Sequence, residues 1–348
     1  MCIFARAKTG GEVDKRRRLA LWGLAVFVMA IVLLPLGSYL YTAVSPAQAA
    51  AEKQTNPRAN YWRAVREGDK GYSAVTGLVP GGERVNHGQD VLIQNGGQNW
   101  RQARNGPVAS IMPWVLAFTV AALFLVFLYR GQVKLEKQPS GRTVARYNIA
   151  ERVLHWYTAV LFIILSLTGL SMLFGRAVLI PVLGLRGFSA WADFSIILHN
   201  YLGPFFIIGV VLMILSWIKD NIPSSVDWEW FRQGVGGLLA KGKHPPAERF
   251  NAGEKIFVFW GGLVVLGIIV SITGLYLIGW IGSGARGTMQ TADIIHAIAG
   301  VFWTCIIIGH IYLGLVTQGA ITGMWTGEVS EEWAKQHHDV WYQEAKKG

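Results

Sequence analysis

Charged residues are scarce in this chain. Only 15% of its 348 residues are Asp, Glu, Lys or Arg, whereas 52% are hydrophobic. Soluble globular proteins carry about 25% charged residues. Several apolar runs are also long enough to cross a bilayer, so the shortage of charge indicates membrane spans rather than a large soluble core. The sequence therefore predicts an integral membrane protein.

Cysteines are also few, and the two present, Cys2 and Cys305, exclude two kinds of redox centre. An iron–sulfur cluster needs about four thiolates. Covalent haem attachment needs a Cys-x-x-Cys-His motif, which the sequence lacks. No glycine-rich nucleotide-binding motif follows a predicted strand either. Any haem would have to be held by other side chains alone.

The formal net charge of +11 is first a topology signal. Lys and Arg accumulate on the cytoplasmic side of membrane proteins. No basic helix with interleaved aromatic residues stands out, so we expect membrane lipid, and no nucleic acid, as a partner.

The first 145 residues divide into three segments. Residues 1–49 have a basic start, an apolar run and an Ala-Gln-Ala site, which is typical of a signal peptide, although the long run also fits an uncleaved anchor helix. Residues 50–110 are polar and predict a periplasmic region, either a linker or a docking surface. Residues 111–145 predict an additional transmembrane helix and a basic cytoplasmic linker.

Four more apolar runs follow, at 151–174, 196–218, 255–281 and 292–318. Basic residues are enriched on the sides that this alternation assigns to the cytoplasm, so the connections 175–195 and 282–291 would be external. We therefore expect an all-α integral membrane fold. It has a four-helix transmembrane bundle over 146–320 and a cytoplasmic tail over 321–348.

Four histidines lie within these last four spans: His155, His199, His296 and His310. Ionisable residues inside a bilayer are costly, and they are usually functional. His296 and His310 are 14 residues apart on one helix, so they face similar directions at depths that differ by about 21 Å. By depth, His199 pairs with His296 near the external surface, and His155 pairs with His310 near the cytoplasmic surface. Each pair is predicted to bind one haem b axially, which gives two stacked haems.

Other interpretations of these histidines remain open. Each could bond a backbone carbonyl of a neighbouring helix, or serve as a proton relay in a non-redox anchor or transporter. Zinc or di-iron sites fit less well, because they need more ligands at one depth. His337 and His338 are expected to form a surface feature of the tail, and neither these two nor His87 and His244 are expected to bind haem. Small residues in the spans would leave room for a macrocycle or simply serve helix packing: Gly169, Gly203, Gly300 and Gly314.

The sequence around these residues resembles the cytochrome b (gamma) subunit of respiratory formate dehydrogenase over about residues 146–345. The motifs that carry the resemblance are Arg152-Val-Leu-His155-Trp156, Leu198-His199-Asn-Tyr-Leu-Gly203, Phe250-Asn251-Ala-Gly253-Glu254-Lys255, Ile295-His296-Ala-Ile-Ala-Gly300, Gly309-His310-Ile-Tyr, Gly319-Ala-Ile-Thr-Gly-Met324 and Trp333-Ala-Lys-Gln-His-His-Asp-Val-Trp-Tyr342.

The resemblance implies an iron–sulfur (beta) subunit and a catalytic molybdenum- or tungsten-containing (alpha) subunit as partners in the bacterial inner membrane. Electrons from formate would reach the external haem, continue to the cytoplasmic haem and reduce menaquinone or ubiquinone. This chain has no site for formate, so it would be the electron-transfer and quinone-reducing subunit rather than the formate-oxidising one. A cytochrome b subunit of a hydrogenase or of another molybdoenzyme is the alternative.

The resemblance also implies that Asn251, Gly253 and Glu254 border the quinone pocket beside the haem of His310. An asparagine offers a donor and an acceptor to a quinone carbonyl, and Glu254 could deliver protons if its surroundings raise its pKa. Family members can have an amide in place of Glu254. The alternative is that Asn251 caps the following helix and that Glu254 completes a capping box.

Overall fold

The computed structural model describes residues 95–234, 244–282 and 284–347. Within them, five helices are long and apolar enough to cross a membrane: Asn99–Arg130, Ile149–Val178, Ile180–Trp217, Glu254–Leu277 and Gly287–Val316. The predicted all-α membrane fold is thereby confirmed. Residues 1–94, which include the predicted signal peptide or anchor, most of the periplasmic region and His87, lie outside the described residues.

The additional N-terminal helix is one continuous rod packed against the rest of the bundle. It consists of α4 (Asn95–Ala103), the π-helical η1 (Arg104–Val108) and α5 (Ala109–Arg130). Buried residues at four-residue spacing, Val108, Met112 and Leu116, contact the bundle through Phe174 and Ile308. The helix begins well before the predicted span, so the last part of the predicted external region, residues 95–110, is helical.

The first two bundle helices form a tight antiparallel pair. A capping box of Asn148 and Glu151 starts α6 (Ile149–Val178), and a single residue separates it from α7 (Ile180–Trp217). The two spans are longer than the predicted 151–174 and 196–218, because residues 175–195 are almost entirely helical and the connection shrinks to Leu179. Gly184 has φ of 68°, a conformation that glycine adopts without strain, and it bends α7 without a long loop.

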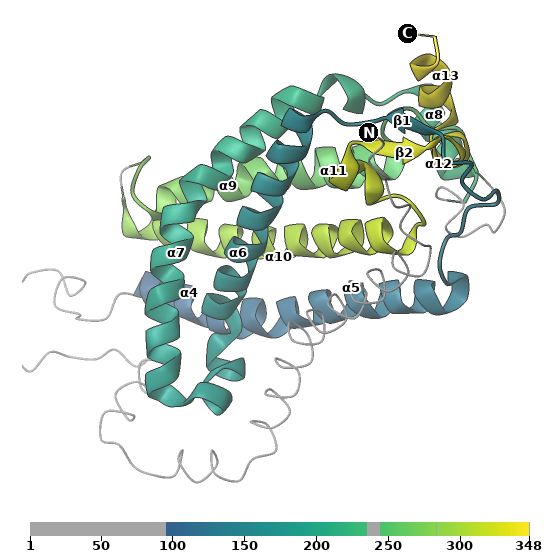
Figure 1. The fold of residues 1–348 in the computed structure, drawn as a ribbon. Helices are drawn as coiled ribbons and strands as arrows, with labels where there is room; N and C mark the ends of the chain where they lie inside the picture. The colour runs from purple at the N-terminus through teal and green to yellow at the C-terminus, as the bar shows by residue number, and fades with distance from the viewer. Residues whose placement is uncertain (1–94, 235–243, 283, 348) are drawn as a thin grey trace, which may run out of the picture.

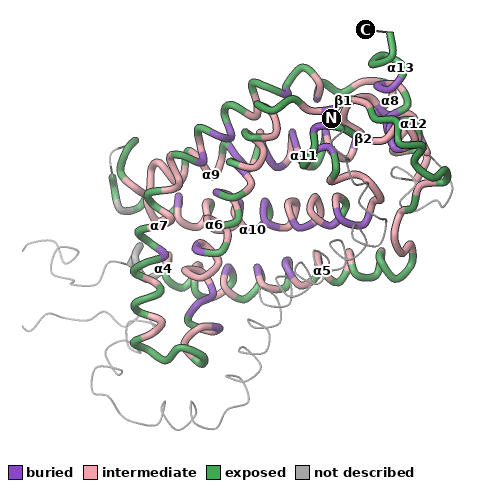
Figure 2. The backbone as a smooth tube through the Cα atoms, viewed as in Figure 1, coloured by how far each residue is buried: buried purple, intermediate pink, exposed green. Residues whose placement is uncertain are grey.

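The third span joins the π-helical η3 (Glu254–Leu266) to α9 (Gly267–Leu277), and α10 (Arg286–Val316) is the fourth. In Figure 1, α10 lies between α9 and α5, and α6 and α7 cross them. Trp303 of α10 is 3% exposed and packs on Phe162 and Phe206 at the centre of the bundle. Figure 2 shows buried residues along α10, whereas much of α5 and α7 is exposed.

A small domain, here called the cap, closes one end of the bundle (Figure 1). It comprises β1 (Thr143–Ala145), α11 (Thr322–Thr326), β2 (Glu328–Ser330), α12 (Glu331–His337) and α13 (Asp339–Ala345). The strands pair antiparallel, with Val144 opposite Val329. Beside the cap lie η2 (Lys219–Asn221) and α8 (Ser225–Arg232), which follow α7.

The cap corrects the prediction of a surface feature for His338, whereas His337 is partly exposed. His338 is only 2% exposed, and its Nδ1 lies 2.6 Å from the backbone carbonyl of Glu248. Trp333 and Tyr342 form the hydrophobic centre around it. The tail is therefore a folded unit, because its aromatic residues pack on the segment that precedes α6.

Two histidine pairs as a candidate functional site

The structure brings the four predicted histidines together as two pairs. His155 of α6 faces His310 of α10 with ring centres 6.3 Å apart and ring planes at 55°. His199 of α7 faces His296 of α10 with ring centres 6.0 Å apart and planes at 73°. The His155 pair lies at the cap end, and we call it the inner pair. The His199 pair lies at the opposite end and is the outer pair.

Two threonines hold the rings of the outer pair. The hydroxyl of Thr168 on α6 lies 2.9 Å from Nδ1 of His199, and that of Thr273 on α9 lies 3.0 Å from Nδ1 of His296. Each hydroxyl has one hydrogen, which it donates to a backbone carbonyl one turn earlier, at 2.8 Å for Thr168 and 2.6 Å for Thr273. Each hydroxyl oxygen therefore accepts from Nδ1–H. This leaves the Nε2 lone pair of both rings available to a metal ion.

A glycine follows each threonine and makes room for the same ring. A Cβ added to Gly169 would lie 3.2 Å from Cε1 of His199, and one added to Gly274 would lie 3.2 Å from Cε1 of His296. The outer pair is thus cradled by two copies of one Thr-Gly arrangement. Gly169 was predicted to leave room for a macrocycle, whereas Thr168, Thr273 and Gly274 were not predicted as site residues. The repeated Thr-Gly-Leu sequence in the two spans was the signal that could have found them.

The inner pair is held differently. Nδ1 of His155 is buried and has no hydrogen-bond partner among the residues that the structure describes. The next residue, Trp156, donates from Nε1 to the carbonyl of Met324 at 3.1 Å and lies against Trp325 with ring centres 4.5 Å apart. Arg152 also donates to the carbonyl of Trp325. Helix α11 of the cap is therefore fixed to α6 within one turn of His155.

The residues of both pairs fit a haem with two axial imidazoles. Rings that bind one metal ion from opposite sides have centres about 6 Å apart, because each metal–nitrogen bond is about 2.0 Å and each nitrogen lies about 1 Å from its ring centre. The observed separations of 6.0 and 6.3 Å match this. Small residues beside the pairs leave open space, since an added Cβ would meet nothing within 4 Å at Gly203, Gly300 and Gly314.

A bare metal site fits less well. Among the described residues, no group of three or more His, Cys, Asp or Glu side chains could hold a metal ion. A haem iron needs only two protein ligands, because the porphyrin supplies the other four, and each pair offers two. The donor set therefore favours haem over zinc or a di-iron centre.

The segment predicted to border a quinone pocket forms the start of η3. The Asn251 side chain accepts from the backbone N–H of Glu254 at 3.0 Å, and the Glu254 carboxylate accepts from that of Asn251 at 2.9 Å. This is the capping box given above as the alternative interpretation. A Cβ on Gly253 would lie 2.9 Å from Trp230 of α8, so the indole packs directly on this glycine.

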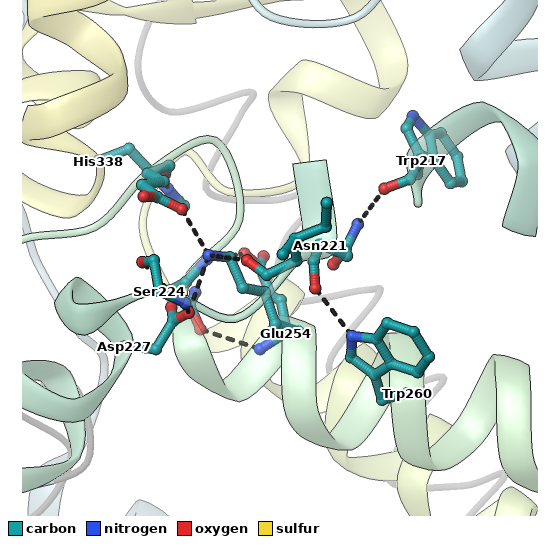
Figure 3. A network of polar contacts seen from close by, with 11 residues as sticks. Trp217, Asn221, Ser224, Asp227, Glu254, Trp260 and His338 are labelled. Atoms are coloured by element: carbon teal, nitrogen blue, oxygen red, sulfur yellow. Dashed lines mark hydrogen bonds and ion pairs between the residues drawn. The ribbon is translucent and has the colours of Figure 1, made fainter. Parts of the chain in front are cut away.

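A buried ion network fixes this segment in place (Figure 3). The Lys255 side chain is fully buried, and its Nζ lies 2.9 Å from Asp227 and 2.5 Å from Glu248. It also donates to the backbone carbonyl of Ile222 at 3.3 Å. The network joins the start of η3 to α8, to the segment that carries Glu248 and to Ile222. These three neighbouring parts of the chain hold the turn at 251–254.

Comparisons with known proteins cover this half of the chain. A family model described as prokaryotic cytochrome b561 matches residues 146–327. The cytochrome b556(Fdn) subunit of nitrate-inducible formate dehydrogenase from Escherichia coli strain K12 is 28% identical over 214 residues, which are 60% of this chain and 94% of that protein. The formate dehydrogenase cytochrome b556(fdo) subunit of the same strain is 29% identical over 59% of this chain and 94% of its own length. The cytochrome b556 subunit of Haemophilus influenzae formate dehydrogenase is 26% identical, with shares of 58% and 83%.

Proposed function

The chain belongs to the prokaryotic cytochrome b561 family, and from this membership we propose that it is the membrane cytochrome b subunit of a formate dehydrogenase complex. The observation that carries the proposal is the pair of facing histidines at each end of α10, inside the segment that the family model matches. The names of the relatives support formate dehydrogenase as the complex.

Two haem b groups, when bound, would carry single electrons between the two ends of the bundle. His199 and His296 would hold one of them through Nε2, and His155 and His310 would hold the other. Thr168 and Thr273 fix the tautomer and orientation of the outer imidazoles, which also raises their basicity as ligands. Between the pairs, Trp303 and the Phe162 and Phe206 rings fill the bundle and exclude water.

The cap end is proposed to face the cytoplasm of a bacterium, with the chain in the inner membrane. Arginines cluster at this end, as the positive-inside rule requires of a cytoplasmic side, and they include Arg146, Arg152 and Arg249. The outer pair would then receive electrons from a periplasmic iron–sulfur subunit, which a catalytic molybdenum- or tungsten-containing subunit supplies. In this assignment the C-terminus is cytoplasmic.

A quinone, menaquinone or ubiquinone, is proposed to bind near the inner pair and to be reduced there. Asn251, Gly253 and Glu254 would border it, because their turn starts η3 at the cap end, and η3 packs on α10, the helix of His310. The capping box uses the oxygen of the Asn251 side chain, which leaves the amide N–H groups of that side chain for a quinone carbonyl. Glu254 would deliver protons to the reduced quinone.

A cytochrome b subunit of a hydrogenase or of another molybdoenzyme is the second candidate. The matching family is described only as prokaryotic cytochrome b561, without a named complex. This description fits the second candidate as well as the first. A non-redox membrane anchor gives no reason for two histidine pairs at the separation that a shared metal ion requires.

Purification of the tagged chain with its native partners tests the proposal. We expect an iron–sulfur subunit and a molybdenum or tungsten subunit to accompany it, and formate to reduce its haem within the purified complex. Reduction by hydrogen but not by formate would select the second candidate. A folded chain that contains no haem would refute both.

A further inference from the structure

The outer pair has a charged neighbour on the same helix. Asp293 lies three residues before His296 on α10, so both side chains share one face of the helix. The Asp293 carboxylate is therefore placed within one helical turn of the His296 ligand. A carboxylate this close to a haem ligand would stabilise the oxidised, more positive haem unless another charge opposes it.

The opposing charge comes from the N-terminal rod, which precedes the segment that the family model matches. Nε of Arg104 in η1 lies 3.3 Å from the Asp293 carboxylate, and Nε1 of Trp100 in α4 donates to the same oxygen at 3.0 Å. Arg104 also donates to the backbone carbonyl of Met172 on α6 at 3.3 Å. Its guanidinium is thus fixed between α6 and α10. The two side chains of the ion pair are only 24% and 29% exposed.

We propose that Arg104 is a positioning residue that sets the redox potential of the haem held by His199 and His296, by neutralising Asp293. The inference rests on the proposed function only in requiring haem at the outer pair. It also gives the rod a role: the rod supplies a cation beside one electron carrier. The inner pair is about 21 Å further along α10, and the Coulomb interaction falls with distance, so its potential should shift much less.

The sign of the effect distinguishes charge from packing. Without the Arg104 charge, Asp293 alone acts on the outer haem and favours its oxidised form, so the potential falls. Without the Asp293 charge, Arg104 alone acts and the potential rises. Removing both charges restores neutrality and a potential near that of the original protein. Each single change is expected to alter the oxidised-to-reduced ratio about tenfold at fixed potential, which corresponds to about 59 mV for one electron.

Spectroelectrochemical titration of the intact complex tests this with Arg104→Gln, Asp293→Asn and the double variant. The exposed Arg176 lies towards the same end of α6, and Arg176→Gln is the matched control that should leave both potentials unchanged. Opposite shifts that cancel in the double variant, and that are much larger at one haem than at the other, support the proposal. Shifts in the same direction, or none, overturn it.

Two further results keep the test decisive. If Arg104→Gln does not assemble, Arg104→Lys must retain the original potential while Asp293→Asn still raises it, and failure of either result overturns the proposal. A complex without haem would refute the proposed function instead. Haem with unshifted potentials would refute only this inference.

Discussion

Replacing Thr168 by valine removes the acceptor of the His199 Nδ1–H and keeps the size of the side chain. The hydrogen bond is 2.9 Å long and Thr168 is 2% exposed, so water cannot take its place. A buried donor left without a partner costs about 1–3 kcal/mol. This agrees with the about 10–100-fold loss of affinity seen when the hydrogen-bond partner of a metal ligand is changed. We expect the outer haem to bind about 10–100-fold more weakly, and the inner haem to bind as before.

The assay measures the transfer of haem from the purified protein to a haem-scavenging globin. The loss of the outer-haem absorbance reports this transfer. Thr158→Val is the matched control. Thr158 lies on the same helix, is 5% exposed, and donates only to the carbonyl of Leu154 among the contacts observed. Retention of haem by Thr168→Val to the same extent as in the original protein, or equal loss from Thr158→Val, would refute the role given to Thr168.

Three further predictions concern the cradle, the ion network and the cap. Gly169→Ala should displace the His199 ring, because the new Cβ would lie 3.2 Å from Cε1. The outer-haem content should therefore fall, although alanine favours the helix by about 1 kcal/mol. An unchanged haem content would contradict this. Lys255→Met leaves Asp227 and Glu248 without their cation and should destabilise the protein by about 3 kcal/mol, seen as a lower unfolding temperature in detergent; an unchanged temperature would argue against the network. Burial, and next the charge of His244, lowers the pKa of His337 to about 4 from 6.5. Between these pH values His337 binds a proton in the unfolded chain but not in the folded cap. The contribution of His337 to cap stability is therefore full above about pH 6.5. It should fall by up to about 1.4 kcal/mol per pH unit towards pH 4. Burial also lowers the pKa of His338 well below 6.5, so His337→Gln should reduce the pH dependence without abolishing it, as measured by tryptophan fluorescence during denaturation.

The spans could be predicted from the sequence because a bilayer fixes both their length and their composition. The pairing of the histidines also followed, since 14 residues on a straight helix determine depth and direction. The ends of the first two bundle spans were not predicted. The helices continue through most of 175–195, because Pro181 fits the first turn of α7 and Gly184 absorbs the bend.

The supporting residues of the site depended on tertiary contacts. A threonine in an apolar helix usually bonds a carbonyl one turn back, and Thr168 and Thr273 do so. Only the packing of α6 on α7 and of α9 on α10 shows that their oxygens also accept from histidines. The burial of His338 depends on Glu248, 90 residues away, and no local pattern carries that contact.

The most direct test of the account is an optical redox titration of the purified protein, with haem counted per chain, for the original sequence and for each single histidine-to-alanine variant. The account predicts two haems with separable potentials. His199→Ala and His296→Ala should lose one component, and His155→Ala and His310→Ala should lose the other. Loss of the same single component in all four variants, or a folded protein without haem, would contradict it.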